Sequence, residues 1–168
     1  MNKKILTISI IALALDQISK VLASLFLTLN QSIMVIPNFF YLTLVSNEGA
    51  AWGLFSNAKI VIAIGTILAL LLIYHFIYCF KPNNRNYLAF GLLIGGLGGN
   101  LIDRLMFGYV RDFLDFYIFN YDYPVFNVAD ISIVIGVILL IITIIKGEDV
   151  SENNSNRKSR KTRQISSK

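Results

Sequence analysis

Four apolar stretches, each close to the length of a membrane-spanning helix, constrain this chain more than any other feature. They cover residues 5–29, 60–80, 87–105 and 124–145. A helix needs about 20 mainly apolar residues to cross the hydrocarbon core of a bilayer. The sequence therefore predicts an all-α membrane protein built as a bundle of four transmembrane helices.

The composition agrees with a membrane location and limits the available chemistry. Charged residues make up 15% of the 168 residues, whereas about a quarter is usual in soluble domains. Cys79 is the one cysteine, which excludes a disulfide framework and a multi-cysteine metal site. His75 is the one histidine, which excludes HExxH chemistry. Polar chemistry in this chain must therefore depend mainly on carboxylates.

The basic residues predict the orientation of the four helices. They gather before the first stretch, between the second and third, and after the fourth, as Lys3, Lys4, Lys81, Arg85 and Lys146. The opposite side carries only Lys59, Arg104 and Arg111. Under the positive-inside rule both termini are expected in the cytoplasm. The basic segment 147–168, rich in Ser and Asn, is predicted to be a disordered cytoplasmic tail, and nucleic-acid binding is not needed to explain its charge.

Two long segments, 30–59 and 106–123, lie on the outer side in this topology. Residues 39–45 are rich in aromatic and β-branched side chains and follow Pro37, a pattern that predicts a short strand. The second segment holds eight aromatic residues, a density typical of the membrane–water interface. We therefore expect a small extracytoplasmic, β-rich cradle at the outer end of the bundle.

The acidic residues are concentrated on the same outer side. Six of the ten lie there, namely Glu48, Asp103, Asp112, Asp115, Asp122 and Asp130. Asp16 lies inside the first helix, and Lys20 follows it at i,i+4, where one helical face can neutralise both. Ionisable groups at membrane depth cost about 2.5–3.5 kcal/mol on insertion scales, so they persist when paired, hydrated or functional. A buried ion pair that supports packing and a functional role explain this pair equally well.

The third apolar stretch ends in a polar group above a row of small residues. Three glycines recur at i, i+4 and i+8, namely Gly91, Gly95 and Gly99. Such a row lets a neighbouring helix approach closely. Asn100 and Arg104 share a face one turn further on, with Asp103 beside them. A nucleotide-binding interpretation of the glycines fails because no βαβ context exists.

The residue types narrow the chemistry that an outer catalytic site could use. A serine–lysine dyad at Lys20 is disfavoured because neighbouring residues diverge on a helix. Two carboxylates that share one proton can activate a water molecule without a protein nucleophile. Asp112 and Asp130 are the best-placed pair, with Asp130 one to two turns into the last helix, which Pro124 is expected to start. A structural pairing of acids and a hard, oxygen-liganded metal ion remain alternatives.

Five short motifs occur in order along the chain: DQISK (16–20), NEGAAWG (47–53), GNLIDR (99–104), GYVRDF (108–113) and FNVAD (126–130). Together they resemble the motifs of the bacterial lipoprotein signal peptidase family, also called signal peptidase II. The resemblance covers residues 16–130 and leaves the segment 147–168 outside it.

The resemblance implies an aspartic endopeptidase of the bacterial cytoplasmic membrane, without metal or cofactor, whose active site lies near the outer face. It would cut diacylglyceryl-modified prolipoproteins just before the lipidated cysteine. By motif position, Asp112 and Asp130 correspond to the catalytic pair. The residues that support the site or the substrate correspond to Asp16, Lys20, Asn47, Asn100, Asp103, Arg104 and Asn127. Residues 1–146 would form one peptidase domain, which acts as a monomer among membrane phospholipids.

A proton-coupled carrier and a non-enzymatic assembly subunit are the other classes that suit such a bundle. A carrier usually places its acids near the midplane and contains a repeat. Here the acids cluster outward and the sequence has no internal repeat. An assembly subunit would explain the glycines and the aromatic residues, but it leaves Asp112 and Asp130 without a role.

Overall fold

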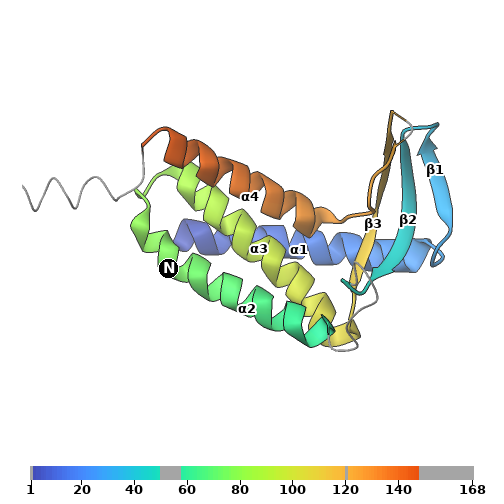
Figure 1. Cartoon of the computed structure of the whole chain (residues 1–168), viewed down its shortest axis with the longest axis horizontal. Coiled ribbons are helices and arrows are strands. Elements are labelled where there is room, and N and C mark those ends of the chain that lie inside the picture. The colour runs from blue at the N-terminus through green and yellow to red at the C-terminus, as the bar shows by residue number, and fades with distance from the viewer. Residues whose placement is uncertain (1, 50–57, 120, 148–168) are drawn as a thin grey trace, which may run out of the picture.

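The computed structural model describes residues 2–49, 58–119 and 121–147, which form four long helices and a small sheet (Figure 1). The helices are α1 (Lys3–Phe26), α2 (Ala58–Phe76), α3 (Asn84–Phe107) and α4 (Val128–Ile145), and a short 3-10 helix, η1 (Ile77–Cys79), extends α2. The strands are β1 (Ser32–Ile36), β2 (Phe40–Asn47), β3 (Val110–Ile118) and β4 (Tyr121–Asp122). The expected combination of apolar helices with a β-rich segment is confirmed. Residues 50–53 of the second motif and the tail from 148 onward lie outside the described residues.

The four long helices are long and apolar enough to cross a membrane. α3 is the central helix: half of its most apolar window is buried, and it packs against α1, α4 and α2. α2 instead leaves large apolar side chains such as Ile60, Val61 and Leu71 exposed. A helix that is hydrophobic all round is typical of a membrane span, because lipid can cover the faces that protein does not.

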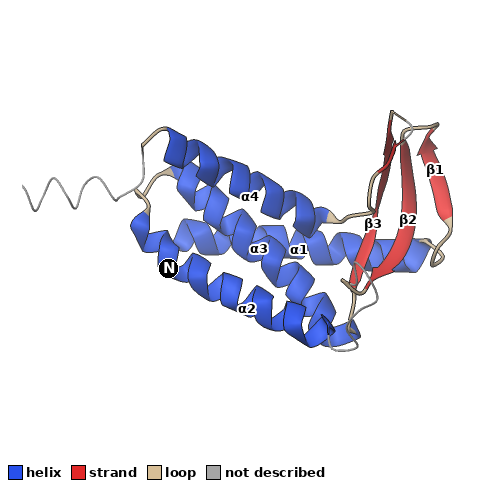
Figure 2. Cartoon of the chain, in the orientation of Figure 1, coloured by secondary structure: helices blue, strands red, loops and turns tan. Residues whose placement is uncertain are grey.

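The sheet lies at one end of the helices (Figure 2) and is antiparallel, with the strand order β1-β2-β3-β4. β2 confirms the strand expected at 39–45. β3 lies in the aromatic segment 106–123, for which the sequence pattern predicts no strand. A register shift after Leu42 places Asp112 of β3 opposite Val45 of β2. An apolar cluster that includes Ala23 of α1 attaches the sheet to the helices.

Glycines on α3 allow the neighbouring helices to approach closely. The predicted row of Gly91, Gly95 and Gly99 is confirmed, and all three face α1. A methyl group on Gly95 would lie 2.7 Å from the carbonyl oxygen of Ser9, well inside van der Waals contact. Gly96 makes the same kind of close approach to α4. α3 therefore brings α1 and α4 near enough for their polar side chains to meet.

α4 begins at Val128 rather than at Pro124, so Asp130 lies in its first turn and not one to two turns in. The Asn127 side chain accepts a hydrogen bond from the backbone N–H of Asp130, and the Asp130 carboxylate accepts one from the backbone N–H of Asn127. This capping box satisfies N–H groups that the start of a helix leaves unpaired. The residues before it remain extended because Phe126 pairs with β3.

Gly95→Ala should destabilise the folded protein, because the added methyl group has no room against α1. We expect a loss of about 1–3 kcal/mol, the usual cost of overpacking. Gly98→Ala is the matched control, since its new methyl group would meet only the Leu13 side chain, at 3.9 Å. Thermal unfolding of both purified variants in detergent measures the difference, and equal midpoints would contradict the close helix contact.

Candidate active site

The predicted polar residues converge where the sheet meets the helices. α3 ends at Phe107, and the next residue, Gly108, has a left-handed conformation (φ 79°) that suits glycine and turns the chain into β3. Asp112 follows on β3, and Asp130 lies in the first turn of α4. The turn after α3 and the capping box of α4 thus deliver the two carboxylates to the same end of the bundle.

Asp112 is 1% exposed and is held by two amide donors. Asn47 Nδ2 donates to one carboxylate oxygen at 2.8 Å, and Asn127 Nδ2 donates to the other. Burial raises the pKa of Asp112 to about 6, and repulsion from Asp130 adds to the rise, whereas the two amide hydrogen bonds lower it. A carboxyl group in this environment can carry a proton close to neutral pH.

Asp130 is half-buried and is held by α3 and by the start of its own helix. Its Oδ1 accepts a hydrogen bond from Asn100 Nδ2 at 2.8 Å, and its Oδ2 accepts one from the Asn127 backbone N–H at 3.2 Å. Asn127 therefore contacts both acids, Asp112 through its side chain and Asp130 through its backbone. The two carboxylates are close enough to repel each other electrostatically.

A buried ammonium group lies behind the two carboxylates. Lys20 has no exposed surface; its Nζ lies 2.9 Å from Asp16 Oδ2 and donates to Asn100 Oδ1 at 2.8 Å. The predicted i,i+4 ion pair is thus confirmed. The other Asp16 oxygen accepts a hydrogen bond from the backbone N–H of Ala129 at 2.9 Å. The Asn100 amide is held in one orientation, with its oxygen toward Lys20 and its nitrogen toward Asp130.

Two side chains that the sequence pattern does not single out complete this network. Arg111 binds both oxygens of Asp103, with Nη2 at 2.7 Å from Oδ1 and Nε at 3.1 Å from Oδ2. Gln17 Nε2 donates to Asp103 Oδ1 at 3.2 Å, and its Oε1 accepts a hydrogen bond from Arg111 at 3.2 Å. The sequence did offer a signal for these two residues: Gln17 directly follows Asp16, and Arg111 directly precedes Asp112.

Arg104 joins the same group of residues with fewer contacts. Its Nη1 donates to the Asn100 carbonyl oxygen at 3.4 Å, and its charge interacts with those of Asp130 and Asp112. Within the described part of the chain, its guanidinium makes no hydrogen bond to a side chain. The structure thus brings all nine predicted residues together: Asp16, Lys20, Asn47, Asn100, Asp103, Arg104, Asp112, Asn127 and Asp130.

An open cleft of about 440 Å³ borders Asp112. The end of β2 and the segment before α4 form its walls, which comprise Val45, Ser46, Asn47, Glu48, Asp112, Pro124 and Val125. The lining is mixed, with four polar or charged residues beside three apolar ones. The cleft therefore places open space beside the buried Asp112 carboxyl group.

Three stacked phenylalanine rings lie close to this cleft. The rings of Phe40 and Phe116 have centroids 4.6 Å apart, and those of Phe116 and Phe126 have centroids 5.6 Å apart. Phe116 lies on β3, the strand that carries Asp112, and Phe126 directly follows Val125 of the cleft wall. Aromatic rings from β2, β3 and the segment before α4 therefore stack near the acid.

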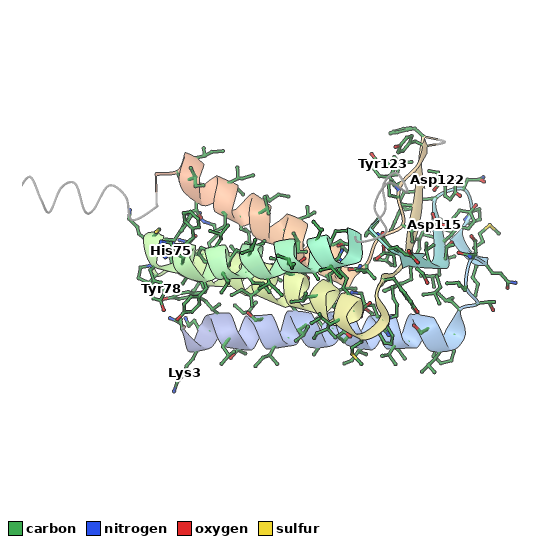
Figure 3. The ribbon with its side chains drawn as sticks, turned by 60° about the horizontal axis from the view of Figure 1, so that its bottom comes forward. Lys3, His75, Tyr78, Asp115, Asp122 and Tyr123 are labelled. Atoms are coloured by element: carbon green, nitrogen blue, oxygen red, sulfur yellow. The ribbon has the colours of Figure 1, made fainter. Side chains whose placement is uncertain are left out.

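Hydrogen-bond donors surround the carboxylates at this site. Each oxygen of Asp112 and Asp130 accepts a bond from an Asn side chain or from a backbone N–H. Among the described residues, no group of three or more His, Cys, Asp or Glu side chains is arranged to hold a metal ion. Figure 3 shows His75 at the opposite end of the molecule from Asp115 and Asp122 of the sheet, so the one imidazole does not reach the site.

Most of this chain is similar to known proteins of one family. A family model described as signal peptidase (SPase) II matches residues 8–146. The lipoprotein signal peptidase of Staphylococcus carnosus (strain TM300) is 43% identical over 141 residues, which cover 83% of this chain and 89% of that protein. The lipoprotein signal peptidase of Staphylococcus aureus (strain JH9) is 41% identical over 140 residues, which cover 83% and 86%.

A solved structure, titled as a bacterial membrane enzyme at 1.9 Å resolution, matches this chain with a TM-score of 0.78 at 39% identity and covers 84% of this chain and 92% of that one. A second, at 2.3 Å resolution, has a TM-score of 0.74. The apolar helices and the clustered carboxylates thus belong to a membrane peptidase. The chain is a member of the signal peptidase II family, as its five motifs suggested.

The raised pKa of Asp112 predicts that stability falls as the pH rises. Below the ordinary value of 3.8 the carboxyl group is protonated in both folded and unfolded chains. Between 3.8 and about 6 it ionises in the unfolded chain alone, which favours unfolding. The resulting loss in the free energy of unfolding approaches about 3 kcal/mol once the pH exceeds the higher of these two pKa values.

Unfolding midpoints measured between about pH 4 and about pH 7 should therefore fall more steeply for the parent than for Asp112→Asn. Asp122→Asn, which alters an exposed carboxylate of β4, should keep the slope of the parent. Parallel profiles for the parent and Asp112→Asn would show that burial does not perturb this acid.

Proposed function

We propose that this protein is an aspartic endopeptidase of the bacterial cytoplasmic membrane that cuts diacylglyceryl-modified prolipoproteins before the lipidated cysteine, with Asp112 and Asp130 as the catalytic pair. The observation that carries the proposal is the residue they share: Asn127 donates to Asp112 from its side chain and to Asp130 from its backbone, and a cleft borders Asp112. Two nearby carboxyl groups in unlike surroundings can act as base and acid. The substrate class is supported by the name of the relatives, lipoprotein signal peptidase.

The pair would activate a water molecule directly. The ionised carboxylate takes a proton from the water, whose oxygen attacks the scissile carbonyl carbon, while the protonated carboxyl group donates to the carbonyl oxygen. The tetrahedral diol collapses when the C–N bond breaks: the carboxyl group that took the proton from water gives it to the leaving nitrogen, and the other carboxylate takes back a proton from a diol hydroxyl. The signal peptide leaves with a new carboxyl group, and the lipidated cysteine gains a free amine. Burial suits Asp112 to carry the shared proton.

The supporting residues hold the pair and balance its charge. Lys20 orients the Asn100 amide, which in turn donates to Asp130. Arg104, whose charge interacts with those of both acids, is suited to stabilise the negative charge that develops on the carbonyl oxygen. Asn47 lines the cleft and also donates to Asp112, so the peptide would bind against a residue that holds the acid.

The stacked rings of Phe40, Phe116 and Phe126 offer an apolar surface for the acyl chains of the substrate. Phe116 belongs to the same strand as Asp112, and Phe126 directly follows Val125 of the cleft wall, so the lipid would be bound near the scissile bond. Apolar groups around the carboxylates would also exclude water and strengthen the electrostatic interactions within the site.

The sheet end of the molecule is extracytoplasmic in this proposal. Lys3 and Tyr78 lie at the other end, opposite Asp122 and Tyr123 (Figure 3). Because basic residues gather on the cytoplasmic side, both termini would be cytoplasmic, including the tail 147–168.

One chain supplies every residue of the site, so a monomer is sufficient. Membrane phospholipid would cover the exposed apolar helix faces.

Asp112→Asn and Asp130→Asn should each lower cleavage by about 10³-fold or more, because an amide can neither accept nor donate the required proton. The measurement is kcat of the purified variants on a diacylglyceryl-modified prolipoprotein in detergent micelles. Asp122→Asn is the matched control and should cleave at the rate of the parent. Cleavage by either Asn variant at a tenth or more of that rate would rule out the pair, and loss of parent activity with a chelator would favour a metal site.

The proposed orientation predicts opposite labelling of two positions. Cys79 is exposed at the end of η1 and should react with a membrane-impermeant maleimide only after cells are lysed. Asp122→Cys, introduced together with Cys79→Ser, should react in intact cells. The reverse pattern would place the sheet in the cytoplasm and refute the orientation.

A further inference from the structure

We propose that Arg111 is a positioning residue that fixes the place of Asp112. It acts by tying the start of β3 to Asp103 of α3, with Gln17 of α1 as a second anchor. The inference rests on the proposed catalytic role of Asp112, and it assigns to Arg111 a part in turnover without contact to the substrate.

Arg111 is attached to Asp103 at three points. Its backbone N–H donates to Oδ2 at 3.0 Å, its Nε to Oδ2 at 3.1 Å and its Nη2 to Oδ1 at 2.7 Å. Two parallel bonds from a planar guanidinium group to both oxygens of a carboxylate resist rotation. Nη2 also donates to Gln17 Oε1 at 3.2 Å, and the guanidinium lies 4.7 Å from the centre of the Phe107 ring. α1 and α3 therefore hold this side chain together.

Both carboxylates of the proposed pair then take their positions from α3. Asn100 of α3 donates to Asp130. Asp103 lies about one turn further along the same helix and holds the residue that precedes Asp112. Any shift of β3 against α3 would therefore change the separation of the two acids. Arg111 points to the opposite face of the strand from Asp112, because adjacent residues of a strand point to opposite faces. Its bonds to Asp103 on that face prevent such a shift.

Arg111 is 8% exposed and does not line the cleft beside Asp112. Within the described residues it makes no hydrogen bond to Asp112 or Asp130. Loss of the guanidinium should therefore leave the binding surface intact and misplace the acid. The expected signature is a fall in kcat with little change in KM.

Arg111→Lys and Arg111→Met test this role. Lysine keeps the charge but replaces the two-point fork with one flexible group, whereas methionine removes every side-chain donor. We expect kcat to fall about 10-fold for Arg111→Lys and about 100-fold for Arg111→Met, since small misplacements at a reacting centre cost this much. KM for a diacylglyceryl-modified prolipoprotein should stay within about threefold of the parent value.

Arg85→Lys is the matched control, because Arg85 lies at the other end of α3, where its Nε donates to Thr143 at 3.0 Å. It should leave kcat and KM unchanged. Rates are expressed per folded molecule, since a merely structural role would lower the folded fraction and the unfolding midpoint but not the kcat of molecules that remain folded.

A parent-like kcat in folded Arg111→Met, or a rise in KM without a fall in kcat, would overturn the positioning role. If Arg111→Met does not fold, the same split between kcat and KM in Arg111→Lys decides the question. Retained activity in Asp112→Asn would instead refute the catalytic pair itself, so the two failures are distinguishable.

Discussion

Lys20 lies inside the bundle with no exposed surface, although an ionisable side chain at membrane depth costs about 2.5–3.5 kcal/mol even on insertion scales. Its charge is met by Asp16 at 2.9 Å and by Asp103 at 3.7 Å. Asp16 lies on α1 with Lys20, whereas Asp103 belongs to α3, so the second acid reaches the ammonium group only when the two helices are together. A buried ion cluster adds little net stability, because desolvation offsets the attraction. Its consequence here is to specify which helix faces meet.

Packing and charge are coupled at Gly99. A Cβ atom there would collide with the Asp16 carboxylate, so the missing side chain makes room for the acid that neutralises Lys20. The same carboxylate accepts a hydrogen bond from Ala129 at 2.9 Å, at the start of α4, where a helix favours negative charge. One acid thus connects three helices and sets the position of the turn that carries Asp130.

Local spacing was sufficient to predict the four helices and the ion pair of α1, and motif order predicted the residues that share the site. β3 was not predicted because its aromatic residues suit the membrane interface as well as they suit a strand, and because its pairing with β2 depends on a register shift. The start of α4 was misplaced because Pro124 is a good first residue, but the capping box at Asn127 determines the start. The bond between Gln17 and Arg111 spans 94 positions and therefore leaves no trace in any local pattern.

The unlike surroundings of Asp112 and Asp130 follow from the elements that carry them. Asp112 stands on a strand, where alternating peptide dipoles nearly cancel and burial raises its pKa. Asp130 stands in the first turn of α4, where it is half-buried and accepts hydrogen bonds from the Asn127 backbone N–H and from the Asn100 side chain. Asn127 caps that helix and also donates to Asp112, so the residue that starts α4 brings the two acids together. Two chemically identical side chains thus lie in unlike surroundings, as the proposed acid–base mechanism requires.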